Sequence, residues 1–371
     1  MAGCKRIGIL TSGGDAPGMN AAVRAGALVG LSLGMEVIGI ERGYRGLLED
    51  AMAPLKPGDV SSILREGGTI LGSARCKEFH QREVRDRARA ILANRGIDGL
   101  VVIGGNGSLT GAIHLADATE IGSGPPLKVL GIPASIDNDL GLTGLSIGVD
   151  TAMNTIVEAC DKIADTATAH DRTFIVEVMG RDCGYLAMTS AIAVGADLAL
   201  FPEAGKPASE IVDQIVDTVL TIRKGSRKAR RVIVIKAEGV AIPAEQLKEA
   251  VDAKLRELAP DSDSSIETRV TVLGHVVRGG RPSAFDRLLG SRLANVAVRA
   301  LHAGLSHKMA AWMPPVELPE DVAVRSTADP YCWLVDLAAV IAETNNLLSG
   351  KSPLARWRAG AFSEIENALL L

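Results

Sequence analysis

Short apolar runs alternate with helical segments along almost the whole chain. The apolar runs show no regular alternation with polar residues, which predicts strands that are buried on both faces. They lie at residues 7–10, 37–40, 100–103, 129–132, 174–178, 198–201, 232–235 and 270–273. The predicted helices between them lie at residues 19–31, 85–94, 151–164, 211–223, 244–258 and 287–303.

This order of strands and helices predicts an α/β fold with mostly parallel sheets. No internal repeat and no long linker of proline, glycine or serine interrupts the pattern. In parallel sheets, ligands bind beyond the carboxyl ends of the strands, where the connecting turns lie. The turns that directly follow the apolar runs are therefore the expected positions of functional residues.

The composition is that of an ordinary globular protein with mixed charge. Of the 371 residues, 47% are hydrophobic and 23% are charged, and the net charge is −4. The length is sufficient for two α/β domains. No basic stripe interleaved with aromatic residues indicates a nucleic-acid partner. One basic run, at residues 223–231, is more typical of a solvated helix end than of an anion site.

We expect a cytoplasmic protein. The chain runs directly into its first predicted strand, without the apolar leader of a signal peptide. It contains no run of about 18 apolar residues, so we expect no membrane span. The five cysteines have no metal-binding spacing, which is typical of reduced, buried thiols in a cytosolic protein. They are Cys4, Cys76, Cys160, Cys183 and Cys332.

Three glycine-rich segments indicate a phosphate-binding site. They read Thr-Ser-Gly-Gly-Asp-Ala-Pro-Gly-Met-Asn at residues 11–20, Arg-Glu-Gly-Gly-Thr-Ile-Leu-Gly-Ser-Ala-Arg at 65–75 and Gly-Gly-Asn-Gly-Ser at 104–108. Glycines let the backbone approach an anion, and the free N–H groups at the start of a helix favour phosphate. Taken singly, the first and third segments are equally compatible with plain connections between a strand and a helix.

Two aspartates follow the predicted strand at residues 129–132. Asp137 and Asp139 lie in Pro-Ala-Ser-Ile-Asp-Asn-Asp at residues 133–139. One carboxylate can accept the proton of an attacking hydroxyl while the other holds Mg²⁺ near the transferring phosphoryl group. A surface turn stabilised by hydrogen bonds of the aspartates is the alternative interpretation.

Arginines gather at the ends of predicted strands. Arg172 and Arg269 each begin a strand, and Arg181 follows one. Arg278 lies with His275 in Gly-His-Val-Val-Arg-Gly-Gly at residues 274–280. Guanidinium groups match phosphate with two parallel hydrogen bonds, so four such arginines favour a sugar-phosphate site over isolated surface ion pairs. For the histidine, a structural role is equally compatible with the sequence.

Together and in this order, these motifs resemble the bacterial type of ATP-dependent 6-phosphofructokinase. The resemblance covers roughly residues 5–303 and includes Val-Glu-Val-Met-Gly-Arg at 176–181 and Thr-Val-Leu-Gly-His-Val-Val-Arg-Gly-Gly at 271–280. It implies a fold of two Rossmann-like lobes with mostly parallel sheets. The implied nucleotide lobe is 1–140 plus about 277–310, and the implied sugar-phosphate lobe is 141–276 plus 311–371.

The resemblance also implies an activity and a set of site residues. The activity is phosphoryl transfer from Mg·ATP to the 1-hydroxyl of fructose 6-phosphate, which gives fructose 1,6-bisphosphate in glycolysis. Asp137 matches the catalytic base, Arg181 a cation that stabilises the transition state, and Ser135 a neighbouring hydroxyl. Nucleotide contacts are matched by Gly14, Tyr44, Arg75, Cys76, Gly105, Asn106, Gly107, Ser108 and Gly111.

The implied sugar-phosphate contacts are more widely spread along the chain. They are matched by Ser135, Asp137, Asp139, Arg172, Met179, Gly180, Arg181, Glu238, Arg269, His275 and Arg278. Of these, Arg172 and Arg269 match arginines that reach into the site of a neighbouring subunit. The resemblance therefore implies a homo-oligomer, a tetramer with shared active sites. The implied magnesium positions are Asn106 and Asp139.

Some residues depart from the family pattern. Asn106 stands where the family usually has an aspartate that helps to hold magnesium, so metal affinity should be lower. Ser135 replaces the usual threonine and keeps the hydroxyl, whereas His80 replaces a common arginine on the nucleotide side. Ala134 stands where ATP users mostly have glycine and pyrophosphate users have lysine. Gly107 agrees with the ATP users.

These departures leave two alternatives beside the ATP-dependent kinase. One is the same reaction with pyrophosphate as the phosphoryl donor. The other is a non-catalytic regulatory subunit that binds sugar phosphate, which the loss of a carboxylate at Asn106 would explain. The presence of Asp137, Asp139 and Arg181 argues against the second alternative.

Overall fold

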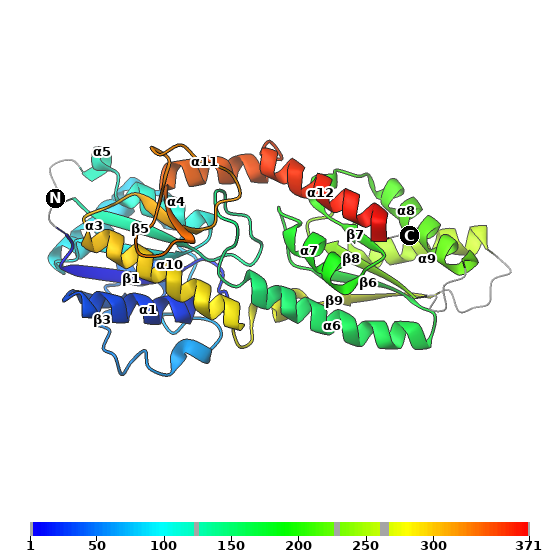
Figure 1. Ribbon diagram of the computed structural model, residues 1–371, viewed down its shortest axis with the longest axis horizontal. Helices are drawn as coiled ribbons and strands as arrows, with labels where there is room; N and C mark the ends of the chain where they lie inside the picture. Colours follow the sequence, from blue (N-terminus) through cyan, green and yellow to red (C-terminus); the bar gives the residue numbers. More distant parts are fainter. Residues whose placement is uncertain (1–2, 122–125, 226–230, 260–266, 370–371) are drawn as a thin grey trace. The chain divides into compact units, whose positions relative to one another are not determined.

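The chain forms two compact units. The computed structural model describes residues 3–121, 126–225, 231–259 and 267–369. The first unit comprises Met1–Thr151 and Arg278–Asn346, and the second comprises Ala152–Val277 and Leu347–Leu371. Figure 1 shows the elements of both units.

The first unit is built on an eight-stranded sheet with the order β11-β12-β10-β5-β4-β1-β2-β3. The five central neighbours β10, β5, β4, β1 and β2 pair in parallel, and the pairs that involve β3, β11 or β12 are antiparallel. The strands are Arg6–Ser12 (β1), Glu36–Ile40 (β2), Met52–Pro54 (β3), Gly99–Gly104 (β4), Lys128–Pro133 (β5), Lys308–Trp312 (β10), Ala323–Arg325 (β11) and Cys332–Asp336 (β12).

Helices cover both faces of this sheet, which explains why its strands lack alternation. Every residue of β4 is buried, for example. Helices α1 and α10 lie side by side on one face, and α3 and α4 lie on the other (Figure 1). The helices are Met19–Ser32 (α1), Gly43–Leu48 (α2), Arg82–Asn94 (α3), Asn106–Leu115 (α4), Ala118–Ile121 (α5), Ala284–His302 (α10) and Leu337–Leu348 (α11), the last of which ends at the unit boundary.

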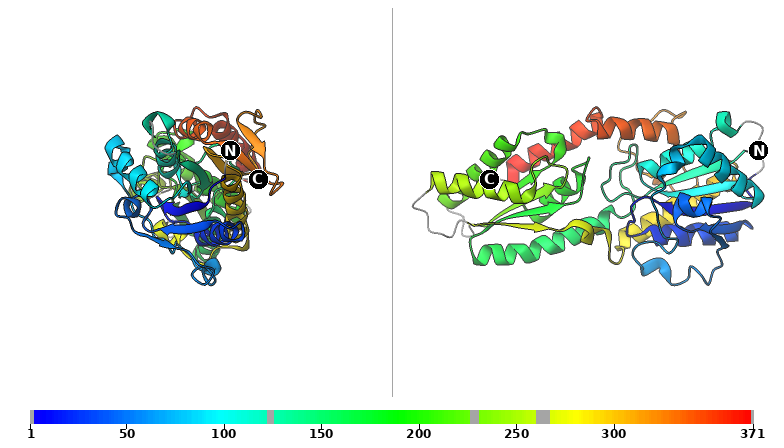
Figure 2. Two further views of the ribbon diagram at one scale, coloured as in Figure 1. Left: turned by 90° about the vertical axis from the view of Figure 1, so that its left-hand side faces the viewer. Right: turned by 180° about the vertical axis from the view of Figure 1, so that it is seen from behind.

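The second unit has a sheet of four parallel strands in the order β7-β8-β6-β9. Helices α8 and α9 pack side by side on one face, and α6 runs along the opposite side (Figure 2). The strands are Thr173–Val178 (β6), Leu198–Leu200 (β7), Val232–Ala237 (β8) and Thr268–Val272 (β9). The helices are Val149–Ala169 (α6), Tyr185–Val194 (α7), Ala208–Lys224 (α8), Ala244–Leu258 (α9) and Pro353–Leu369 (α12).

The predicted fold class is confirmed, and all eight predicted strands and six predicted helices are present, with ends that differ by a few residues. One expected boundary is wrong. Residues 311–346, which we expected in the second lobe, belong to the first unit because β12 pairs with β10 and extends its sheet. The sequence pattern also missed short strands such as β3 and β11 and the two C-terminal helices α11 and α12.

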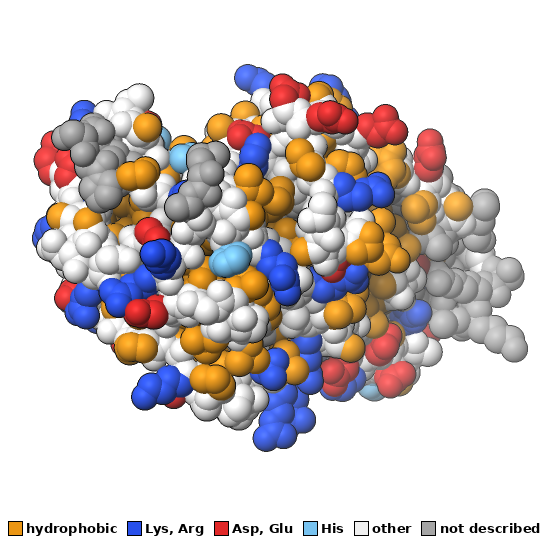
Figure 3. Space-filling model, turned by 60° about the vertical axis from the view of Figure 1, so that its left-hand side comes forward, with side chains coloured by type: hydrophobic (Ala, Val, Ile, Leu, Met, Phe, Trp, Pro, Cys, Tyr) orange, Lys and Arg blue, Asp and Glu red, His pale blue; other side chains and the backbone are white. Residues whose placement is uncertain are grey.

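The surface carries both signs of charge. On the face in Figure 3, lysine and arginine side chains are interspersed with acidic ones. The five cysteines are free thiols, of which Cys76 is half-buried and the others are buried. Among the described residues, no helix is both long and apolar enough to cross a membrane. Of the basic run, Arg223 and Lys224 end α8 and Arg231 lies just before β8, whereas residues 226–230 lie outside the described part of the chain.

Candidate active site

Three turns meet at the carboxyl edge of the first unit's sheet. They follow β1, β4 and β5, which are adjacent in the sheet. A Cβ atom placed on Gly13, after β1, would lie 3.2 Å from the hydroxyl of Ser108, after β4. A Cβ atom on Gly105 would lie 3.8 Å from that of Ser135, after β5. These turns lie far apart along the chain, and the adjacency of their strands in the parallel sheet brings them into contact.

The turn after β1 exposes its backbone. Gly13 and Gly14 are exposed, and Gly13 has a φ angle of 89°, which favours glycine. The guanidinium of Arg278 lies against this turn, where its Nη1 donates a hydrogen bond to the carbonyl of Asp15 at 3.3 Å. A Cβ atom on Gly14 would lie only 2.7 Å from that Nη1. The structure therefore places Arg278, predicted as a sugar-phosphate contact, beside the predicted phosphate-binding turn.

The glycine-rich loop at residues 66–73 is fastened to this turn by a buried asparagine. Asn20 donates hydrogen bonds to the carbonyls of Glu66 at 3.1 Å and Gly67 at 3.2 Å, and it accepts one from the amide of Ile70 at 2.8 Å. The side chain of Asn20 is 1% exposed. Its three bonds fix the path of the loop on both sides of its glycine pair. Although Asn20 ends the motif at residues 11–20, no local pattern indicates that it holds a separate loop.

Two hydroxyls attach the far end of the same loop. Thr11 forms a hydrogen bond with the hydroxyl of Thr69 and donates to the carbonyl of Gly72, both at 2.8 Å. Ser73 donates to the carbonyl of Gly13 at 2.5 Å. The exposed Arg75 follows directly, so the loop ends with an accessible guanidinium.

The turn after β4 opens into α4. Gly105 precedes the first residue of the helix, Asn106, so the unpaired amides of the helix start lie at this edge. Gly107 is exposed, and a Cβ atom there would meet nothing within 4 Å. The side chain of Asn106 is half-buried, and its Oδ1 lies 3.4 Å from the hydroxyl of Thr110, at the limit of a hydrogen bond.

Three of the predicted nucleotide contacts lie in or around α4, and packing involves each of them. The ring of Tyr44 is 4% exposed and stacks on Phe79 at 4.1 Å, and its hydroxyl donates to the carbonyl of Ser108 at 2.6 Å. Burial raises the pKa of Tyr44 well above its ordinary value. A Cβ atom on Gly111 would lie 2.9 Å from this ring. Cys76 packs against the same core, and burial raises the pKa of its thiol, so it remains protonated at neutral pH.

The turn after β5 presents its polar residues on one side. Ser135, Asp137 and Asp139 are half-buried, whereas the residues between them are fully buried. One of those, Asn138, has a φ angle of 50° and uses its amide to bond the carbonyl of Gly144 at 3.1 Å. Because Asn138 is anchored inside the protein, Asp137 and Asp139 on either side of it are held half-buried, and one carboxylate oxygen of Asp137 is itself buried.

The third turn offers oxygen ligands but no complete metal cage. The hydroxyl of Ser135 donates to Asp139 Oδ1 at 2.6 Å, which fixes one carboxylate. Within the described ranges, no group of three histidine, cysteine or acidic side chains is close enough to hold a metal ion. Magnesium at phosphoryl-transfer sites takes only one or two carboxylates, and waters and phosphate oxygens complete the shell. Asp139 and the amide oxygen of Asn106 fit that requirement.

In the second unit, two predicted sugar-phosphate segments are packed backbone to backbone. Gly180 and Arg181 follow β6, and Glu238 follows the neighbouring β8. The amide of Gly239 donates to the carbonyl of Gly180 at 3.1 Å, and a Cβ atom on Gly239 would lie 1.8 Å from the carbonyl oxygen of Arg181. Arg181 and Glu238 are exposed, whereas Met179 is only 7% exposed.

Arg172 and Arg269 lie at the opposite end of the same sheet. They stand at the amino ends of β6 and β9, where Thr173 pairs with Thr268. Strand β6 has 6 residues, so roughly 20 Å separates them from the segments after β6 and β8. Both arginines form ion pairs with Glu267, at 3.5 Å and 2.6 Å. His275 is exposed in the turn Gly274–Arg278 that follows β9.

The sequence was also compared with known proteins. The family model described as phosphofructokinase matches residues 6–301. The chain belongs to the phosphofructokinase family. The resemblance predicted from the motifs is thereby confirmed.

Curated relatives of the phosphofructokinase family match most of the chain. The chain is 46% identical over 305 residues to an "ATP-dependent 6-phosphofructokinase" of Clostridium acetobutylicum, which covers 82% of this chain and 88% of that protein. It is also 46% identical over 307 residues to a protein of the same name from Thermotoga neapolitana, which covers 83% of this chain and 89% of that protein.

Solved structures of phosphofructokinases share the fold. The enzyme of Saccharomyces cerevisiae matches with a TM-score of 0.78 and 34% identity, over 94% of this chain and 47% of that one. The enzyme of Pichia pastoris in the T-state matches with a TM-score of 0.83 and 34% identity, over 100% of this chain and 40% of that one. The chain therefore spans less than half the length of these yeast chains.

Proposed function

We propose that this phosphofructokinase transfers the terminal phosphoryl group of ATP to the 1-hydroxyl of fructose 6-phosphate. The observation that carries the proposal is the meeting of the three turns after β1, β4 and β5 at one sheet edge, with the half-buried Asp137 on the third of them. Exposed glycine amides and a helix start supply donors for phosphate oxygens. The bacterial relatives that match most of the chain are named for ATP-dependent activity.

Asp137 is proposed as the general base. Its carboxylate accepts the proton of the 1-hydroxyl as that oxygen attacks the phosphorus atom in line. The neighbouring Ser135 orients Asp139 through their 2.6 Å hydrogen bond. Arg75 and the amides near Gly14 stabilise the negative charge that develops on the transferring group, and the family resemblance implies the same role for Arg181.

Magnesium is the proposed metal cofactor, held by Asp139 and Asn106. When bound, it neutralises charge on the phosphate oxygens of the donor. Because Asn106 supplies an amide oxygen without charge, this chain's own ligands offer one full negative charge at most from this pair. We therefore expect weaker metal binding than an aspartate at position 106 would give.

ATP is proposed as the donor rather than pyrophosphate. A bulkier residue at position 107 would project from the start of α4, whereas Gly107 leaves more than 4 Å free there. Ala134 offers no cation to replace the nucleotide. A coupled assay with the two donors in parallel tests this proposal, with higher kcat/KM expected for ATP. Higher kcat/KM for pyrophosphate at saturating magnesium would overturn the donor assignment.

The proposed assembly is a homotetramer in the cytoplasm that shares its active sites. Arg172 and Arg269 lie roughly 20 Å from the segments after β6 and β8, which is beyond the reach of an arginine side chain. They therefore cannot bind the same ligand as Arg181 and Glu238 of their own chain. Completion of a neighbouring subunit's site accounts for their position.

A further inference from the structure

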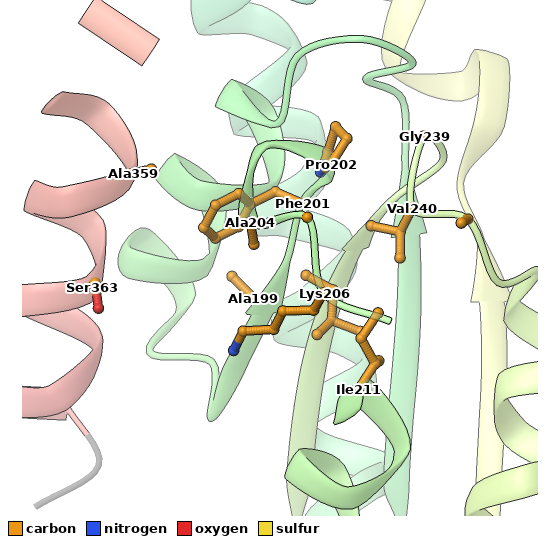
Figure 4. Close-up of a pocket in the computed structure, with 13 residues that line it drawn as sticks. Ala199, Phe201, Pro202, Ala204, Lys206, Ile211, Gly239, Val240, Ala359 and Ser363 are labelled. Carbon is orange, nitrogen blue, oxygen red and sulfur yellow. The ribbon is translucent and has the colours of Figure 1, made fainter. Parts of the chain in front are cut away.

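The second unit contains a cavity that the proposed reaction does not use. Its volume is about 410 Å³, within the range of small-molecule sites. The wall between β7 and α8 includes Phe201, Pro202 and Lys206, and the end of β8 contributes Gly239 and Val240 (Figure 4). The remaining wall comes from the C-terminal helix α12.

The cavity exists because α12 is anchored on both sides of a stretch of small residues. The ring of Phe362 meets that of Phe201 edge to face, with centroids 5.5 Å apart. Leu354, the second residue of the helix, packs in one cluster with the buried Cys183. Between these contacts the helix presents Ala359, and Ser363 directly follows Phe362. Both side chains are too small to fill the space (Figure 4).

The chemistry of the lining is apolar with a single charge. Lys206 is the only charged residue among the 13 that line the cavity. Its ammonium donates a hydrogen bond to Gln214 Oε1 at 2.8 Å and lies 3.9 Å from Glu210 Oε1. An ammonium group has three donors, so Lys206 keeps two beyond its bond to Gln214. An anion in the cavity would compete for them with Glu210.

We propose that this cavity binds a small monocarboxylate with an aromatic or branched aliphatic body. The apolar body would replace water against Phe201, Ile211 and Val240, and the carboxylate would pair with Lys206. A ligand with several charges does not fit, because one lysine cannot compensate the desolvation of a nucleotide or a bisphosphate.

The cavity floor is continuous with the proposed sugar-phosphate site, and this part of the inference rests on the proposed function. Gly239 and Val240 follow Glu238 directly, and Gly239 is locked to the backbone of Gly180 and Arg181. A ligand that presses on this segment must therefore shift or stiffen both sugar-phosphate loops. Occupancy changes the affinity for sugar phosphate to the extent that the ligand prefers one loop arrangement.

Calorimetric titration with 1-naphthylacetate and its neutral analogue 1-naphthylacetamide tests the site. The wild-type protein should bind the carboxylate at least tenfold more tightly than the amide. Lys206→Gln should remove that difference and change amide binding less than twofold. Ala359→Trp should weaken both ligands at least tenfold, whereas Arg356→Trp, an exposed position on the same helix, should leave both unchanged.

Equal affinity for the two compounds, or unchanged binding to Ala359→Trp, would overturn the site. Ser363→Trp fills the same space from an exposed position and replaces Ala359→Trp if that variant fails to fold. The effect of the cavity ligand on sugar-phosphate binding is measured separately. In wild-type protein at saturating ATP, 1-naphthylacetate should shift the half-saturating concentration of fructose 6-phosphate at least twofold, and in Ala359→Trp it should not.

The ligand site and its effect on sugar-phosphate binding are contradicted by different results. Binding by calorimetry without any shift of half-saturation would leave the site and overturn the coupling. A wild-type protein that neither binds nor phosphorylates fructose 6-phosphate would overturn the proposed function, while the calorimetric comparison of the two compounds would still decide the site.

Discussion

In the first unit, the glycine-rich turns are held by buried side chains, whereas in the second unit the predicted phosphate-binding arginines are half-buried or exposed. Asn20 and Asn138 are almost fully buried, and each bonds several backbone groups. Arg172 and Arg269 share one glutamate near the surface. Buried hydrogen bonds fix a position, while exposed ion pairs are weak and exchangeable. We infer that the first unit supplies fixed geometry for the chemistry and that the second supplies adaptable charge.

The largest expected effect is the loss of the proposed base in the first unit. Asp137→Asn should lower kcat by about 10²–10⁴-fold, because an amide cannot accept the proton of the hydroxyl. Binding of fructose 6-phosphate should change little. Steady-state kinetics and equilibrium binding separate the two quantities. A kcat within fivefold of the wild-type value would remove Asp137 from the mechanism.

The next largest effect concerns Arg269, which we propose completes the active site of a neighbouring chain. Arg269→Ala and Asp137→Ala should each be inactive alone. After unfolding and refolding together, random pairing should restore roughly a quarter of the wild-type activity, since some shared sites combine two intact halves. Native electrophoresis with a tag on one variant verifies that hybrids form. Hybrids without recovered activity would show that the sites are not shared.

A smaller effect is expected from loosening the fixed geometry of the first unit. Asn20→Ala removes three hydrogen bonds and leaves buried backbone groups without partners, at a cost of about 1–3 kcal/mol. The KM for ATP should rise about tenfold, with little change in the KM for fructose 6-phosphate. Ser32→Ala, at the exposed end of the same helix, is the control. Equal effects on both substrates would mean that the loop does not act on the nucleotide alone.

Asn106→Asp should improve function rather than impair it, by strengthening the binding of magnesium. A carboxylate at the start of α4 adds a charged magnesium ligand, and the helix dipole favours a negative charge there. The magnesium concentration for half-maximal activity should fall about threefold to tenfold. Asn94→Asp introduces the same charge at an exposed position on α3 and should have no effect on the magnesium requirement. An unchanged requirement in Asn106→Asp would exclude position 106 as a ligand.

The smallest expected effect comes from the ion pairs at the amino ends of β6 and β9 in the second unit. Glu267→Gln removes the counter-charge that Arg172 and Arg269 share, so the half-saturating concentration of fructose 6-phosphate should fall about twofold. The free energy of unfolding should change by less than about 0.5 kcal/mol, because exposed ion pairs contribute little. Glu245→Gln on α9 serves as the control. A rise in half-saturation would instead indicate that Glu267 orients the arginines.

The sequence by itself determined the fold class and the three glycine-rich turns. Buried parallel strands need apolar runs, and turns near an anion need glycine, so both leave local signals that can be read without the fold. The family-specific order of motifs then implied the roles proposed for Asp137 and Asp139. Local patterns sufficed here because each signal depends on neighbours in the chain.

Only the tertiary structure decided which distant residues meet. The adjacency of β1, β4 and β5 brings the turns together, and the return of the chain after β9 brings Arg278 to Gly14. The resemblance implies a nucleotide contact for Tyr44, whereas the structure buries its ring against Gly111. The cavity under α12 depends on the small side chains of two residues, and their effect appears only because Phe362 and Leu354 anchor the helix. Such features have no local signature, because contacts between remote segments depend on strand order and on what packs against each face.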